Sequence, residues 1–390
     1  MTGSRGPLRL VIASNLYPPL LGGPATQSEL LAKGFARHGC KVRVLTHGSE
    51  PDTEIVRYIA KSEMRSIAAT LARYRTTLRE VRAQFEDFRP DAAIVQTSAG
   101  PLQAAVGIAA RQRGIPSVMK IANDPLLDFK NARIAKGART NSATYAARRA
   151  SRWLAGAAGM RLHSFVWATT PAFSERIRER YLVPEGKMMV RPNLFDLPEA
   201  TPRLRAGTAA GRLLYAGRLQ PIKGVDILLD AVATMRHAPW TLTIAGDGDA
   251  SYRRSLKDRA TALGVADRVA WVGPLSSEAL DEAYRAADIL AVPSRSEAFG
   301  NVIVEAMARG LPVVATAVGG TPYILQDGKA GVLVEPQSSA DLAKKLDALL
   351  DDPQRCSELS VAGLTRARDF GIDDGTVEWI SFFEACRSDA

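Results

Sequence analysis

Short apolar runs alternate with segments of helical spacing along nearly the whole chain, and this alternation restricts the fold more than any other feature. Residues 41–46 alternate as a strand does, whereas residues 65–88 carry an apolar side chain every three or four positions, like one face of a long helix. The alternation lapses at 193–212, where Pro and Gly interrupt it, and then restarts. Strands that alternate with helices build parallel sheets. We therefore predict two α/β domains joined by a linker.

The length and composition agree with two such domains. A chain of 390 residues is expected to form two or three domains. Its three cysteines, Cys40, Cys356 and Cys386, follow no metal-binding spacing, and an odd, sparse count argues against a disulfide framework. No apolar run approaches the roughly 20 residues that a membrane-spanning helix needs, and the first run is typical of a strand rather than of a secretory signal. The composition predicts a cytoplasmic protein with reduced thiols.

The basic residues are concentrated in the first half. Residues 1–200 carry 30 Lys and Arg against 16 Asp and Glu, whereas residues 201–390 carry 21 against 25. Residues 129–174 hold eight Lys or Arg and no acidic residue, with Trp153 and Trp167 among them. A basic surface with aromatic side chains suits an anionic membrane, although a plain solvated surface has the same composition. No nucleic-acid-binding signature is present, so nucleic acid is not an expected partner.

The segment 297–305, Glu-Ala-Phe-Gly-Asn-Val-Ile-Val-Glu, follows an apolar strand and opens a helix. Ligands of open α/β sheets bind beyond the carboxyl ends of the strands. Gly300 permits close approach of the backbone to a ligand, and the amides of residues 300–302 suit a phosphate. Glu305 lies one turn into the helix, where its carboxylate is able to accept two sugar hydroxyls. An ordinary turn with acidic residues near a helix start explains the same pattern.

A second motif, at 215–224, has Arg218 and Lys223 between a strand and a helix. Two cations there are able to hold a diphosphate, the Arg as a bidentate donor and the Lys as a point charge. When a diphosphate leaves in a glycosyl transfer it gains negative charge, so fixed cations lower the barrier. Two solvated side chains in a loop are the alternative interpretation.

Two further motifs lie in the first half. Gly22 and Gly23 follow the first strand, where they either allow close approach of a phosphate or acceptor, or form a simple turn. Asp124 follows the strand at 117–119 and precedes Pro125. Its carboxylate either projects from the strand end and orients an acceptor hydroxyl, or forms a turn.

As an ordered set, these motifs resemble the retaining glycosyltransferases of GT-B fold called group 1, over about residues 10–385. The elements that carry the resemblance are Gly22-Gly23, Pro192-Asn193, Gly217-Arg218-x4-Lys223-Gly224, Gly246-Asp247-Gly248, Val272-Gly273 and Glu297-x7-Glu305. The resemblance implies two Rossmann-like parallel-sheet domains that face each other across a cleft. The implied parts are an acceptor-binding domain at 1–195, a nucleotide-sugar-binding domain at 196–370, and a helix at 371–390 that crosses back to the first domain.

The resemblance also implies roles for single residues. Arg218 and Lys223 contact the diphosphate of the donor, and Glu305 binds its ribose. Glu297 and the backbone of residues 299–301 contact the donor sugar and phosphate. The implied donor-binding residues are Gly22, Gly23, Arg218, Lys223, Phe299, Gly300, Asn301 and Glu305, and the implied catalytic residues are Arg218, Lys223, Glu297 and Asp124.

This chain departs from the family's pattern at one place. Many members have a His in the loop where this chain has Asn123-Asp124, and Asp124 is the natural substitute. The resemblance makes Asp247-Gly-Asp249 a turn after a strand rather than a metal site, so no metal is expected.

The predicted function is that of a retaining, metal-independent hexosyltransferase without a cofactor. It moves a hexose from a UDP- or GDP-sugar to a glycan or lipid-linked saccharide in cell-surface polysaccharide biosynthesis. The alternative is a non-catalytic subunit of a polysaccharide assembly complex that binds a sugar nucleotide or glycan. The mark of such a subunit would be loss of Arg218, Lys223 or Glu305, and all three are present. We expect a cytoplasmic enzyme, with the inner face of the cell membrane as a second location.

Overall fold

The computed structural model divides the chain into two compact units. Unit 1 comprises Met1–Asp196 and Ile372–Ala390, and unit 2 comprises Leu197–Gly371. The residues that the structure describes are 6–18, 23–48, 52–59, 67–96, 100–122, 124, 126, 142–203, 211–237 and 239–388, with the side chains of 67–70 and 142–144 excepted. Residues 204–210 of the predicted linker therefore lie outside the described residues.

Within its described residues, unit 1 contains a parallel sheet in the strand order β3-β2-β1-β4-β5-β6-β7. The strands are β1 (Arg9–Ser14), β2 (Lys41–His47), β3 (Val56–Ile59), β4 (Ala92–Val95), β5 (Ser117–Lys120), β6 (Phe165–Ala168) and β7 (Met188–Val190). The helices are α1 (Gly23–Arg37), α2 (Ile67–Phe88), α3 (Pro101–Gln112), α5 (Ser142–Leu162), α6 (Pro171–Tyr181) and α14 (Ile372–Ser388), with the 3₁₀ turn η1 (Glu185–Lys187).

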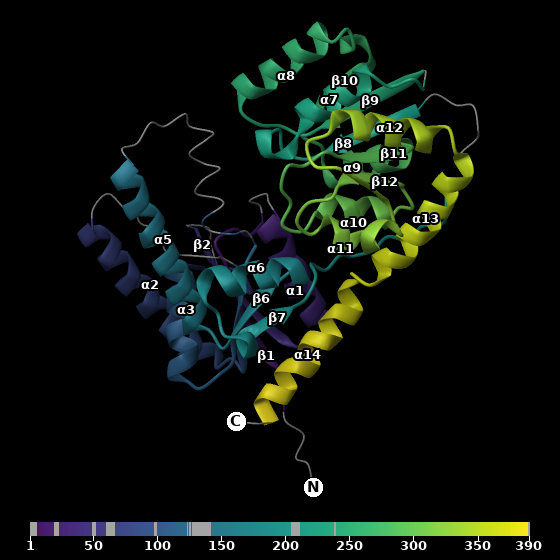
Figure 1. Ribbon diagram of the computed structural model, residues 1–390. Helices are drawn as coiled ribbons and strands as arrows, with labels where there is room; N and C mark the ends of the chain where they lie inside the picture. The colour runs from purple at the N-terminus through teal and green to yellow at the C-terminus, as the bar shows by residue number, and fades with distance from the viewer. Residues whose placement is uncertain are drawn as a thin grey trace. The chain divides into compact units, whose positions relative to one another are not determined.

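Both faces of the unit 1 sheet are covered, which is why its strands are apolar throughout rather than alternating. Ile12 of β1 packs with Phe35 of α1 and Trp379 of α14 on one face. Its neighbour Val11 belongs to the core of the other face, with Phe85 of α2. Helix α14 is thus a structural part of unit 1, where it lies against α1 (Figure 1).

The long helix predicted at 65–88 is present as α2, but its apolar face is buried over only part of its length. Val81 and Phe85 are fully buried, as the spacing predicts. Leu71 and Tyr74, on the same predicted face, are 57% and 39% exposed. Helical spacing identifies the apolar stripe of a helix and not the extent of the surface that covers it.

Unit 2 repeats this architecture. Its described residues form a parallel sheet in the order β10-β9-β8-β11-β12-β13. The strands are β8 (Gly211–Ala216), β9 (Trp240–Ala245), β10 (Val269–Gly273), β11 (Ile289–Val292), β12 (Val313–Thr316) and β13 (Val332–Val334). The helices are α7 (Val225–Ala233), α8 (Ala250–Ala262), α9 (Ser277–Ala286), α10 (Asn301–Met307), α11 (Thr321–Ile324), α12 (Ser339–Leu350) and α13 (Pro353–Arg368), and the 3₁₀ turns are η2 (Pro221–Lys223), η3 (Ala266–Arg268) and η4 (Gln326–Gly328).

The strand order decides where each unit is able to bind a ligand. In both sheets the order reverses next to the first strand, between β1 and β4 in unit 1 and between β8 and β11 in unit 2. Loops that leave neighbouring strands in opposite directions open a crevice at the carboxyl edge of such a sheet. In unit 2 the loops that follow β8 and β11 are those that carry the two strongest sequence motifs.

Candidate functional site

The loops after β8 and β11 are held together by specific contacts. The Arg295 guanidinium donates to both carboxylate oxygens of Asp226, at 2.8 and 2.6 Å, and the Arg295 amide donates to the Ile222 carbonyl at 2.8 Å. Gly224 has a φ of 69°, and a Cβ there would lie 2.0 Å from the Pro293 carbonyl oxygen. Only glycine fits this approach, so the Lys223 turn is fixed against the start of the other loop.

This arrangement joins two of the predicted site residues. The Lys223 Nζ lies 2.6 Å from a carboxylate oxygen of Glu297, and the Ser294 hydroxyl donates to the same oxygen at 3.2 Å. The Lys223 and Glu297 side chains are 22% and 12% exposed, so the pair is largely shielded from water. Arg218 lies in the same β8 loop with its side chain exposed, and its carbonyl accepts a hydrogen bond from the Tyr215 hydroxyl at 2.9 Å.

The backbone around Glu297 is also fixed. Gly319, with a φ of 56°, comes so close that a Cβ would lie 1.6 Å from the Glu297 carbonyl oxygen, and the Gly320 amide donates to that oxygen at 3.1 Å. Gly300 has a φ of 108° and precedes the seven-residue helix α10. The Phe299 side chain is buried, 5.8 Å from the Phe370 ring between centroids. Only the backbone of Phe299 is therefore available for the donor contact predicted there.

Glu305 of α10 is oriented by a residue that the sequence motifs did not identify. The hydroxyl of Tyr284, on α9, donates to a Glu305 carboxylate oxygen at 2.8 Å, and Tyr284 is fully buried. Burial raises the pKa of Glu305, while the hydrogen bond from Tyr284 and the charge of Arg309 lower it. Burial also raises the pKa of Tyr284, so the hydroxyl keeps its proton and remains a donor.

The predicted residues of unit 1 are arranged differently. Gly22 lies outside the described residues, and Gly23 is the exposed first residue of α1. Asp124 is 2% exposed, with its carboxylate paired to the Arg180 guanidinium and accepting a hydrogen bond from the Tyr181 hydroxyl at 2.9 Å. The sequence left open whether this carboxylate projects or forms a turn; in the structure it is held by α6 and also accepts a hydrogen bond from the Leu126 amide at 3.0 Å. Its contact with an acceptor stays a prediction, and the observed partners favour a structural role.

The acidic turn after β9 has a structural explanation. Asp249 caps α8, since its carboxylate accepts hydrogen bonds from the Ser251 and Tyr252 amides, and Asp247 pairs with Arg253. Among the residues that the structure describes, no group of three or more His, Cys, Asp or Glu side chains could hold a metal ion. Cys40, Cys356 and Cys386 form no disulfide bond in the described part of the chain.

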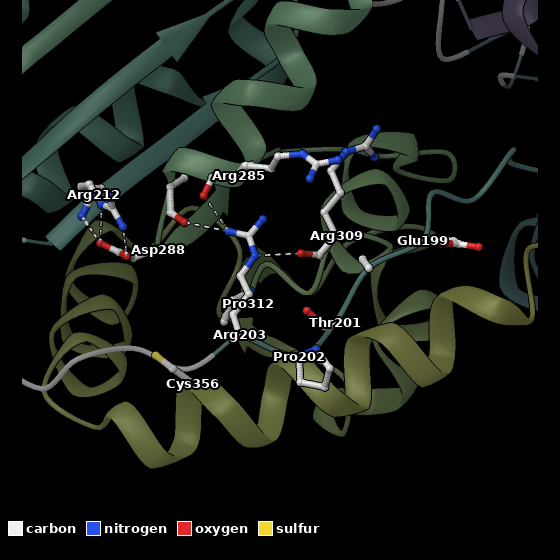
Figure 2. Close-up of a pocket in the computed structure, with 12 residues that line it drawn as sticks. Glu199, Thr201, Pro202, Arg203, Arg212, Arg285, Asp288, Arg309, Pro312 and Cys356 are labelled. Atoms are coloured by element: carbon white, nitrogen blue, oxygen red, sulfur yellow. Dashed lines mark hydrogen bonds and ion pairs between the residues drawn. The ribbon is translucent and has the colours of Figure 1, made fainter.

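A cavity of about 880 Å³ lies at the opposite edge of the unit 2 sheet (Figure 2). Arg203 donates from its guanidinium to the backbone oxygens of Arg309, Arg285 and Ala287, at 2.7, 3.3 and 3.0 Å. These oxygens lie at or just beyond the carboxyl ends of α9 and α10, where a cation is favourable. Arg212 forms a two-pronged pair with Asp288. The basic lining of this cavity is thus satisfied by the protein itself.

Comparison with known families agrees with this geometry. Residues 202–365 match the family model described as glycosyl transferases group 1, and residues 22–194 match the model described as glycosyl transferase 4-like domain. Together with the two parallel-sheet Rossmann-like units, these matches define a protein of GT-B fold.

Individual relatives identify the family. The chain is 32% identical over 304 residues to a D-inositol 3-phosphate glycosyltransferase of Nocardiopsis dassonvillei, over 72% of this chain and 67% of that protein. A protein of the same name from Thermomonospora curvata is 40% identical over 184 residues, but the match spans only 45% of this chain and 43% of the relative. The chain belongs to the group 1 glycosyltransferase family.

Solved structures with the same fold are more distant in sequence. Sucrose-phosphate synthase from Thermosynechococcus elongatus matches with a TM-score of 0.78 at 20% identity, over 98% of this chain and all of that chain. Anabaena HepE in complex with UDP-glucose matches with a TM-score of 0.70 at 21% identity, over 96% of this chain and 99% of that chain. At such identities the likeness establishes the fold alone.

Proposed function

We propose that this protein is a retaining glycosyltransferase that moves a hexose from a nucleotide-diphospho-sugar, held by unit 2, to an acceptor held by unit 1. The observation that carries the proposal is the Lys223–Glu297 pair at the reversal point of the unit 2 sheet, with exposed Arg218 on the same loop as Lys223. The acceptor is proposed to be a glycan or lipid-linked saccharide of cell-surface polysaccharide synthesis. The names of the relatives add a phosphorylated polyol to the acceptors worth testing.

The proposed chemistry needs positive charge at the diphosphate. The bond between the anomeric carbon and the diphosphate oxygen breaks, and an acceptor hydroxyl forms a new bond to that carbon. The hydroxyl proton is transferred to the diphosphate, which leaves with the electron pair of the broken bond. Lys223 and Arg218 stabilise the charge that grows on the leaving group. Because they already supply two positive charges, we include metal independence in the proposal.

Glu297 has a positioning part in this scheme. Its carboxylate holds Lys223 in a single direction before the donor arrives. A diphosphate that binds Lys223 has to share its ammonium group with this carboxylate. The contact between Lys223 and the diphosphate therefore strengthens as negative charge accumulates on the leaving group. An interaction that is stronger in the transition state than in the ground state raises the rate of the chemical step.

The proposal is tested by a transfer assay on the full chain. A thermal-shift screen against UDP-, GDP-, ADP- and dTDP-sugars selects the donor, and the HepE complex makes UDP-glucose the first choice. Transfer is then measured with and without EDTA, and nuclear magnetic resonance gives the anomeric configuration of the product. We expect EDTA-resistant transfer with retained configuration. Inversion would contradict the retaining mechanism, and absence of any donor binding would contradict the proposal as a whole.

We further propose that unit 1 attaches to an anionic membrane surface. Leu154 of α5 is 60% exposed, and Arg148, Arg149 and Arg152 are exposed on the same helix. A cavity of about 560 Å³ beside them is lined by Leu126, Tyr145, Ala146, Arg149, Ala150, Trp153 and Arg180. Apolar and aromatic side chains among cations suit the boundary between head groups and acyl chains.

A flotation assay tests the membrane proposal. Vesicles that contain anionic phospholipid should carry the protein upward at low salt and release it at high salt, whereas purely zwitterionic vesicles should not carry it. Absence of salt-sensitive binding would contradict this part of the proposal. Among the described residues, no helix combines the length and apolarity that crossing a membrane requires.

A further inference from the structure

Polar groups without partners gather at the carboxyl edge of the unit 1 sheet. Among the described residues, the unpaired buried atoms include the Gln96 Nε2, the Lys120 Nζ and the Thr169 Oγ1. These three residues are 3%, 2% and 2% exposed. Each of the three atoms is able to donate a hydrogen bond. Buried polar groups are nearly always paired in folded proteins, so such a set calls for a partner from outside the chain.

The strand register places the three residues on one face of the sheet. Lys120 of β5 is registered with Trp167 of β6, and the pair Val95–Met119 brings Gln96 beside Lys120 on the next strand. Registered residues of parallel strands project to the same face at a spacing of about 4.8 Å. Thr169 follows Trp167 by two positions and so continues on that face. We call Gln96, Lys120 and Thr169 the unpaired row.

Lys120 is the centre of the unpaired row. Its Nζ lies 4.2 Å from the centroid of the Trp167 ring, and burial alone lowers its pKa to about 7. A buried ammonium without a counter-ion is costly. The titratable or charged side chains on the neighbouring elements include Tyr17, Glu29, His47, Asp124, Arg191 and Glu378, and Glu29 is paired with Lys33 at 2.8 Å. Asp124 is already paired with Arg180, and Glu378 with Arg191, so neither carboxylate is a counter-ion for Lys120.

We propose that the unpaired row binds an anionic group, a phosphate or a carboxylate, of the sugar acceptor. The inference rests on the proposed function, in which unit 1 holds the acceptor. It gives that acceptor a negative charge and gives Lys120 the role of recognising it. The unpaired row lies at the carboxyl ends of β4, β5 and β6, on one side of the order reversal, where open α/β sheets bind ligands. A cation over Trp167 that only fills space is the competing explanation.

The binding equilibrium carries a signature that a space-filling lysine lacks. An anion beside the Nζ favours the charged amine and raises its pKa above the value in the free protein. Above about pH 7 the amine is neutral before binding and has to take up a proton when the anion arrives. Affinity for the anion therefore falls as the pH rises, by up to tenfold per pH unit.

The test is calorimetric titration of the full chain with D-inositol 3-phosphate, glucuronate and uncharged myo-inositol, in buffers of different ionisation enthalpy at pH 6.5 and 8.5. The first two ligands distinguish phosphate from carboxylate. We expect at least one anion to bind with proton uptake at the higher pH. We expect Lys120→Met to weaken its binding at least tenfold and to raise the melting temperature, because the unpaired amine is gone. Lys41→Met, at an exposed position at the amino end of β2, is the matched control and should bind as the wild type does.

Three results would overturn the proposal: neither anion binds, binding occurs without proton uptake at the higher pH, or Lys120→Met binds like the wild type. If Lys120→Met does not fold, the test uses Thr169→Val and the proton uptake of the wild type instead. We expect Thr169→Val to bind the anion more weakly than the wild type does. The same samples are titrated with UDP. Normal UDP binding with failed anion binding rejects this inference alone, whereas absent UDP binding counts against the proposed function.

Discussion

The carboxyl edges of the two sheets differ in how their polar side chains are satisfied. In unit 2, Lys223 is paired with Glu297, and Glu305 is held by Tyr284, so the charged groups already form a connected, oriented set. In unit 1, Lys120 has no such partner among the residues that the structure describes. A preorganised carboxyl edge, whose charged groups are already oriented, suits catalysis, because it stabilises the charge of the transition state without reorganisation of the protein. An unsatisfied edge suits recognition, because the ligand supplies the missing counter-ion.

Lys223→Ala is the strongest test of the preorganised edge. The variant should lower kcat by two orders of magnitude or more with the fold intact, because it removes a charge contact with the leaving diphosphate. The measurement is initial-rate kinetics with the preferred nucleotide sugar, together with circular dichroism. Arg253→Ala, which removes an exposed cation paired with Asp247 in the same unit, is the control and should keep the wild-type rate. Equal rates in Lys223→Ala and the wild type would refute the diphosphate assignment.

Glu305→Gln tests whether the oriented carboxylate of unit 2 binds the donor. A neutral amide accepts weaker hydrogen bonds than a carboxylate, so we expect the donor KM to rise roughly tenfold with a smaller change in kcat. Tyr284→Phe should raise KM by roughly threefold, because it removes only the group that orients Glu305. A drop in kcat at unchanged KM would instead make Glu305 part of the chemical step.

The pH dependence of Tyr284→Phe has a definite sign. The hydrogen bond from Tyr284 lowers the pKa of Glu305, so its removal raises that pKa further above the ordinary value. The carboxylate is then lost at a higher pH as the solution is acidified. The acid limb of the donor kcat/KM profile should shift to higher pH in the variant, and a shift to lower pH would contradict the assignment.

Asp124→Asn tests the paired carboxylate of unit 1, with the smallest expected effect on turnover. Its side chain is 1% exposed and its partner Arg180 is 40% exposed, so the loss of the pair should lower the free energy of unfolding by about 2 kcal/mol, less than for a fully buried pair. Urea denaturation measures this change. Glu175→Gln, in an exposed pair with Arg178 on the same helix, should cost less than about 0.5 kcal/mol. A large loss of turnover at unchanged stability would support the catalytic role predicted for Asp124.

The comparison also explains what the sequence was able to predict. Lys223 and Glu297 each lie in a continuous motif after a strand, and their loops meet because β8 and β11 are neighbours in the sheet. No sequence motif identifies Tyr284 or Gly319, because each acts through a distant residue. Tyr284 contacts Glu305, 21 positions away, and Gly319 contacts Glu297, 22 positions away. The unpaired row depends on strand register, which a single strand does not encode. The sequence left the direction of the Asp124 carboxylate open, because that direction depends on Arg180 and Tyr181 of a later helix.

The central claim is that the carboxyl edge of the unit 2 sheet holds the diphosphate of a nucleotide sugar through Lys223. The most direct measurement is the thermal shift of wild-type and Lys223→Ala protein with the best nucleotide sugar of the screen. At 100 times its dissociation constant, the ligand should stabilise the wild type by about 2.7 kcal/mol. The account predicts that most of this stabilisation is absent in Lys223→Ala at the same ligand concentration. Equal shifts in the two proteins would contradict it.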